Sequence, residues 1–93
     1  MNHLSVVSPV DGEIYVERAL ANESLIADTI EKAERAGPSW RKRAVEERVD
    51  LVLKAVDIFV GMKEKLAEEI TWQMGRPIRF APGEINGFEE RAR

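Results

Sequence analysis

The chain has 93 residues, of which 44% are hydrophobic and 33% charged, as in one small globular domain. Its 14 basic and 17 acidic residues give a formal net charge of -3, a balance that argues against a nucleic-acid surface or a membrane patch. The chain has no cysteine and a single histidine, His3, which excludes a thiolate nucleophile, a disulfide framework and a multi-histidine metal site.

Targeting signals are missing from the first residues, which have neither the charged region nor the long apolar core of a signal peptide. No apolar run comes near the roughly 18 residues that a membrane span needs. We therefore expect a cytoplasmic protein without a membrane partner. A chain of this size buries only about 60% of its unfolded surface, so an apolar face that cannot close on itself must find a partner.

The chain opens with two short β-prone runs on either side of a turn that contains Pro9 and the pair Asp11-Gly12. This pattern predicts a β-hairpin over residues 1–19. A two-stranded hairpin is marginal alone in water, so we expect it to lie against the helices or to join another sheet.

A first helix is predicted over residues 22–36, where Asn22 can act as the N-cap and apolar residues recur at helical spacing. Gly37 followed by Pro38 predicts its end. The next residues, up to Arg43, are expected to form a connector that Trp40 anchors to the core.

The second and third helices are predicted over residues 45–60 and 63–74, with a break at Gly61. The second helix is apolar over most of its circumference, which is typical of a helix buried between neighbours. So short a chain can hardly cover it on both sides. This is a first indication that the chain belongs to something larger or oligomeric.

The last quarter of the chain closes the third helix at Gly75, turns at Pro77 and opens a fourth helix, predicted over residues 82–93, at Pro82. This helix shows an apolar face made of Ile85, Phe88 and Ala92. The sequence ends while that face is still open, so we interpret it as a truncated sequence. We expect a second copy of the chain to bind there.

Residues with catalytic chemistry are sparse. The six glycines form neither a GxGxxG nor a GxxxxGK[ST] phosphate loop, and no GxSxG elbow occurs. His3 lies beside a terminus and is a poor general base. We interpret Glu64 and Glu68 as part of a solvated helix face and the basic triplet at 41–43 as a solvated loop. We therefore assign no catalytic, cofactor-binding or metal-binding residue.

Five short motifs occur in order along the chain: Ser8-Pro-Val-Asp-Gly-Glu13, a helix end near Trp40, the helix start Glu47-Arg48, the turn Gly75-Arg76-Pro77, and Ala81 with Glu84 downstream. Together they resemble the amino-terminal segment of the aldehyde dehydrogenase superfamily. There the corresponding pieces are an N-P-x-[TD]-G-E hairpin, an A-x-x-A-x-x-W helix end, an E-R helix start, and a G-[KR]-P turn followed by A-x-x-E. The resemblance covers nearly the whole chain.

The resemblance implies a mainly α segment, a short hairpin followed by three to four helices, that is an incomplete part of a larger α/β enzyme. The family's catalytic cysteine, general-base glutamate and nucleotide-binding units lie downstream of such a segment, so NAD or NADP would belong to the complete parent enzyme and not to this chain. Some members place an acidic residue near a monovalent cation where this chain has Gln73, so no cation site is expected. Arg76 and Glu84 are expected to form a structural ion pair.

Two functions follow as hypotheses. The first is the single amino-terminal segment, residues 1–93, of an NAD(P)-dependent aldehyde dehydrogenase, structural and inactive by itself because it lacks a thiol to attack the aldehyde. The second is a free-standing helical module for protein–protein interaction. Under either hypothesis, exposed apolar helix faces predict a homo-oligomer.

Overall fold

The computed structural model describes residues 2–93, so Met1, the first residue of the predicted hairpin range, lies outside the described part. Strand β1 (His3–Val7) pairs antiparallel with β2 (Ile14–Ala19), with a register shift between Val6 and Val7. The buried Ser8 closes the turn between them: its N–H donates to the Glu13 carbonyl at 2.8 Å and its hydroxyl accepts from Val10 N–H at 3.2 Å. The predicted hairpin is present.

Four helices follow the hairpin: α1 (Glu23–Lys42), α2 (Val45–Gly61), α3 (Lys63–Met74) and α4 (Pro82–Ala92). Asn22 caps α1 by accepting from Leu25 N–H at 2.8 Å, and Pro82 occupies the first turn of α4. Gly61 ends α2, and one residue separates it from α3. The fold is therefore mainly α with a short hairpin at its amino-terminal end, which confirms the predicted fold class.

The predicted end of the first helix is wrong, because α1 continues through Gly37 and Pro38 to Lys42. A proline disfavours the helical conformation in the preceding residue partly by a clash with that residue's Cβ, and Gly37 has no Cβ. The hydrogen bond that Pro38 cannot donate would go to the carbonyl of Glu34, an exposed residue whose carbonyl water can satisfy. Trp40 consequently lies on a helix instead of a connector, and it is 40% exposed.

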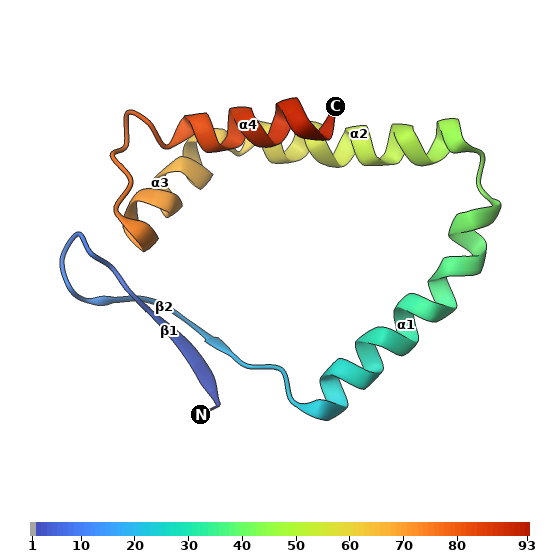
Figure 1. Cartoon of the computed structure of the whole chain (residues 1–93), viewed down its shortest axis with the longest axis horizontal. Coiled ribbons are helices and arrows are strands. Elements are labelled where there is room, and N and C mark those ends of the chain that lie inside the picture. Colours follow the sequence, from blue (N-terminus) through green and yellow to red (C-terminus); the bar gives the residue numbers. More distant parts are fainter. Residues whose placement is uncertain (1) are drawn as a thin grey trace.

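The elements are arranged as an open, flat ring (Figure 1). The hairpin and α1 form one side and the α2–α4 group the other, within extents of 49 × 35 × 15 Å. The radius of gyration is 17.5 Å, whereas a compact chain of this length has about 12 Å. Most of the chain therefore has no opposing layer.

Within the described residues the core is small and lies where α4 packs against α2 and α3. Its buried apolar residues are Val56, Ala67, Ala81 and Ile85. Phe88 contacts Phe59, with ring centroids 4.4 Å apart. The predicted open face of α4 is only partly open: Ile85 is 3% exposed because α2 and α3 cover it, whereas Phe88 is 38% exposed.

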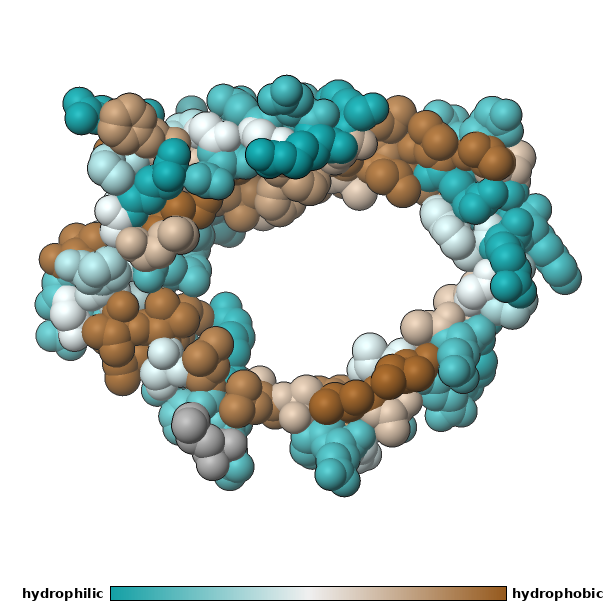
Figure 2. Space-filling model, in the orientation of Figure 1, coloured by the Kyte–Doolittle hydropathy of each residue, from teal (hydrophilic) through white to brown (hydrophobic). Residues whose placement is uncertain are grey.

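Large apolar side chains remain exposed on the other helices, and Figure 2 shows apolar residues around the rim of the opening. No residue of α1 is buried, and only Val56 is buried in α2. On α2 the exposure reaches 60% at Val45 and 68% at Ile58. None of the helices in residues 2–93 combines the length and the apolar character that crossing a membrane requires.

Candidate functional site around the helix stop

The turn after α3 brings together the end of α3, the hairpin turn and the start of α4. Gly75 ends α3 in the left-handed conformation, with φ of 79°, and its N–H donates to the Thr71 carbonyl at 2.9 Å. A Cβ at Gly75 would lie 2.9 Å from Cγ of Pro9 in the hairpin turn. Glycine is therefore required here twice, by the backbone angle and by the approach of the hairpin.

The predicted ion pair between Arg76 and Glu84 is present. Nη1 of Arg76 lies 3.2 Å from Oε1 of Glu84, and Nε of Arg76 donates to the Phe80 carbonyl at 3.3 Å. Both side chains are more than 40% exposed, so the pair contributes about 0 to 1 kcal/mol to stability. The guanidinium thus fastens the turn to the first turn of α4.

The hairpin is held to α3 by Tyr15. Its ring lies parallel to that of Trp72, with centroids 5.8 Å apart, and its hydroxyl donates to Oε1 of Glu69 at 3.0 Å. Partial burial of the phenol, together with this bond and the negative charge of Glu69, raises the pKa of Tyr15 above its usual value. Gln73 donates to the second oxygen of Glu69 at 3.0 Å, so it serves this contact within the chain.

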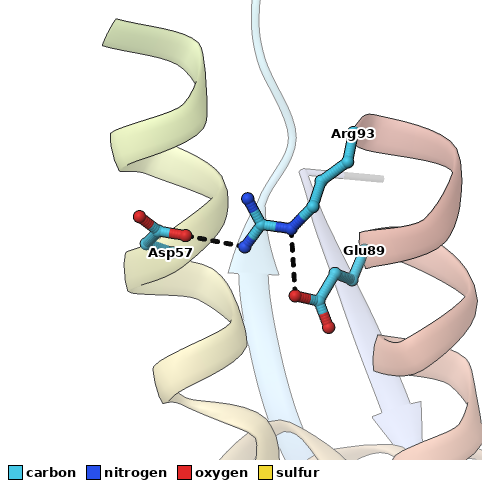
Figure 3. Close-up of polar contacts among 3 residues, drawn as sticks. All are labelled: Asp57, Glu89 and Arg93. Atoms are coloured by element: carbon cyan, nitrogen blue, oxygen red, sulfur yellow. Dashed lines mark hydrogen bonds and ion pairs between the residues drawn. The ribbon is translucent and has the colours of Figure 1, made fainter. Parts of the chain in front are cut away.

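A second polar cluster joins α4 to α2 (Figure 3). Arg93 donates through Nη2 to Oδ1 of Asp57 at 2.7 Å and through Nε to Oε2 of Glu89 at 3.1 Å. The bonds to these two carboxylates raise the pKa of the guanidinium. The arrangement fixes the carboxyl end of α4 on α2.

Two open grooves lie beside these clusters. One, of about 360 Å³, runs between α2, α3 and α4 and is lined mainly by apolar side chains, among them Phe59, Ile70 and Phe88. The other, of about 460 Å³, lies beside Trp40 and the exposed valines at the start of α2. The Arg48 side chain lines this second groove, and its buried Nε has no hydrogen-bond partner in residues 2–93.

The residues weighed from the sequence for chemistry do not come together. His3 is exposed, with Nε2 3.9 Å from Glu17. Within residues 2–93 no three histidine or acidic side chains gather as a metal would need. Of the two glycines with positive φ in residues 2–93, Gly75 faces Pro9, and a Cβ on Gly12 would meet nothing within 4 Å. Glu64 and Glu68 line a third groove together with Trp72.

Sequence reasoning missed both the contact of Tyr15 with Trp72 and Glu69 and the bridge from Arg93 to Asp57. The first spans 54 residues and the second 36. Amphipathic aromatic rings at the edge of a packing surface are an ordinary signal for such contacts, but periodicity does not say which ring meets which. Both contacts hold elements together.

The fold and its polar clusters define a structural segment. The contacts described above hold its hairpin and helices together, and many of its apolar side chains are exposed. The family profile described as "Aldehyde dehydrogenase family" matches residues 1–93, and the chain belongs to that family, as an amino-terminal segment of it. The predicted resemblance is confirmed.

Individual relatives agree. The chain is 35% identical over 72 residues to an aldehyde dehydrogenase of Deinococcus radiodurans, covering 77% of this chain and 14% of that protein. It is 31% identical over 81 residues to the succinate-semialdehyde dehydrogenase [NADP(+)] of the same organism, covering 87% and 17%. The chain thus spans about one sixth of the relatives' length.

A solved structure has the same fold over this segment. An NADP-dependent glyceraldehyde-3-phosphate dehydrogenase from Bacillus halodurans C-125, complexed with NADP, superposes with a TM-score of 0.87 at 26% identity. The match covers 95% of this chain and 18% of that protein. The open ring is therefore an arrangement found within a much larger dehydrogenase.

Proposed function

We propose that this chain is the amino-terminal structural segment of an NAD(P)-dependent aldehyde dehydrogenase, which oxidises an aldehyde to a carboxylic acid. In that enzyme the segment carries no chemistry itself. Its hairpin and α2 lie against the part of the enzyme that binds the nucleotide and holds the catalytic cysteine. The observation that carries the proposal is the TM-score of 0.87 over 95% of the chain with one part of a dehydrogenase.

The exposed face of α2 supports this assignment. Leu51 is 40% exposed and Ile58 is 68% exposed, on the side of α2 away from Val56 and α4. Covering side chains of this size contributes about 1.5 to 3 kcal/mol each when they are fully buried. An enzyme body placed against this side gives the second helix the two neighbours that its apolar circumference predicts.

The nucleotide belongs to that body in this proposal. The described residues do not fit a dinucleotide. Neither α3 nor α4 is preceded by a glycine loop that could bind a pyrophosphate, and Pro9 fills the space beside the left-handed Gly75. The chain also has no thiol for covalent attack on an aldehyde. We therefore expect no aldehyde oxidation by the purified chain, and turnover that survives rigorous removal of host enzymes would contradict the proposal.

The decisive test is the coding sequence beyond Arg93. We expect an in-frame continuation that encodes a β-α nucleotide-binding unit and, further on, a cysteine nucleophile, and we expect the complete product to reduce NAD or NADP with an aldehyde. A product of 93 residues found alone in cell extract and bound to a different protein would overturn the proposal in favour of a free-standing interaction module.

A further inference from the structure

Arg48, in the first half of α2, has a polar atom that the described residues do not satisfy. Its Nε is buried and has no hydrogen-bond partner in residues 2–93. A buried donor on a charged group is costly when it stays unpaired, so folded proteins provide an acceptor for it. The acceptor for Arg48 has to come from outside this segment.

The sequence around Arg48 offers no carboxylate at helical spacing. The positions three and four residues away on either side are all apolar: Ala44, Val45, Leu51 and Val52. Other arginines have a partner one turn away, as Arg35 has in Glu31. Glu47, which is next to Arg48 in the sequence, pairs with Arg43 instead. Arg48 therefore depends on a partner that is distant in sequence.

The second arginine at the same groove has partners of its own. Arg93 lines the groove together with Arg48, and it donates to Asp57 and to Glu89 (Figure 3). Two carboxylates thus neutralise one guanidinium of the groove, whereas the other forms no ion pair within residues 2–93. This charge balance favours a negatively charged occupant.

The walls of the groove favour an ion pair. Apart from the two arginines, its lining is made of apolar residues: Trp40, Val45, Val49, Val52, Leu53 and Ala92. Once such a groove is covered, salt and water screen a pair inside it much less than a pair on the open surface. The planar fork of a guanidinium matches the two oxygens of a carboxylate, so an aspartate or glutamate side chain suits Arg48 better than a single carbonyl.

The end of α4 lies at the rim of this groove. Ala92 and Arg93 belong to its lining, and the Arg93 N–H still donates to the Glu89 carbonyl at 3.1 Å as in a continuing helix. In the proposed enzyme the chain goes on from this rim. The enzyme body therefore starts beside the unpaired guanidinium.

We propose that an aspartate or glutamate of the enzyme body, at a position after Arg93, enters this groove and forms an ion pair with Arg48. Arg48 is then a positioning residue, which fixes the start of α2 on the body and takes no part in the chemistry. The inference rests on the proposed function, because the body supplies the carboxylate.

A carbodiimide tests the pair in the complete enzyme. This reagent couples a carboxylate to an adjacent primary amine as an amide and itself takes up the water that is lost. A guanidinium does not react in this way, so Arg48→Lys introduces an amine where the wild type has none. Peptide mapping by mass spectrometry should find position 48 linked to an aspartate or glutamate after residue 93. The control Arg35→Lys, on the exposed face of α1, should form no link beyond residue 93.

A link from position 48 only to residues 1–93, or no link at all, would overturn the proposal. The proposed function is decided separately, by the coding sequence and the aldehyde assay. A complete enzyme that oxidises an aldehyde but forms no link from position 48 would overturn this inference alone. A chain without a continuation would overturn both.

Stability gives a second readout of the same pair. Arg48→Met, and the amide substitution of the carboxylate found by mapping, should each lower the thermal midpoint of the complete enzyme. The double variant should lose less than the sum of the two shifts, because both substitutions remove one interaction. The control Arg43→Met, whose pair with Glu47 is exposed, should shift the midpoint little. Additive shifts in the double variant would overturn the proposal.

Discussion

At the scale of single residues, the junction at Gly75 is the most constrained point in the chain. The φ of 79° is unfavourable for any residue with a Cβ, and Pro9 occupies the space that a Cβ would take. One glycine thus both ends α3 and seats the hairpin turn. The polar contacts around it, Arg76 with Glu84 and Tyr15 with Glu69, are largely exposed and add specificity more than stability.

We predict that Gly75→Ala lowers the free energy of unfolding by about 1 to 3 kcal/mol, from left-handed strain and the contact with Pro9. Urea denaturation followed by circular dichroism measures it. The matched control is Gly83→Ala in the first turn of α4, where a Cβ meets nothing within 4 Å and helix propensity favours alanine. Equal effects of the two substitutions would show that the junction is not constrained in this way.

Tyr15 gives a spectroscopic prediction, because it is the only tyrosine. Its pKa is raised by partial burial and by the carboxylate of Glu69, so the contact stabilises the fold below about pH 10, the pKa of an unfolded tyrosine, and is lost as pH rises through the higher folded pKa. The tyrosinate absorbance should therefore titrate above pH 10. Glu69→Gln should lower the midpoint, while Glu64→Gln should leave it nearly unchanged. An unaltered midpoint in Glu69→Gln would contradict the contact.

At the scale of elements, most local signals within one turn of the chain predicted the helix ends correctly. Asn22, Pro82 and Gly75 mark helix ends by capping, by a fixed φ and by left-handed freedom, and the structure has the ends where these residues stand. Gly37 and Pro38 misled because each breaks helices on average, whereas in this order the glycine relieves the clash that the proline causes.

The faces of the helices were less predictable than their ends. The apolar side of α4 is evident from the spacing of Ile85 and Phe88, but spacing does not tell which neighbour covers it, and α2 and α3 do. The reverse holds for α2, whose circumference predicts two neighbours while residues 2–93 supply one. The ion pair of Arg76 with Glu84 could be predicted from the sequence, because both residues belong to one short family motif.

Pro38 has a measurable consequence for α1. Pro38→Ala restores a backbone donor in the helix interior and is expected to stabilise the second half of α1 locally by up to about 3 kcal/mol. Slower amide hydrogen exchange between residues 34 and 42 would report it. Pro82→Ala, at a helix start where the N–H has no partner in the helix, should change the exchange in α4 little. Equal protection in both variants would mean that Pro38 is not a weak point.

At the scale of the whole molecule, the chain is a folded segment with too little interior. Its 7650 Å² of exposed surface is about half of what an unfolded chain of 10.5 kDa exposes, while a compact domain of this length leaves only about 40% uncovered. Since stability is a small difference between burial and conformational entropy, a shortfall of this size has to be supplied from outside the chain. In the proposed function, the enzyme body against α2 supplies it.

The last prediction tests the proposed enzyme body against α2. In a complete enzyme that contains this segment, Ile58→Glu places an unpaired charge against that body and should lower the free energy of unfolding. In the isolated chain, where Ile58 is 68% exposed, the same substitution should change it little. Urea denaturation of the two proteins, followed by circular dichroism, measures the difference. An equal effect in both would mean that no enzyme body covers this side of α2.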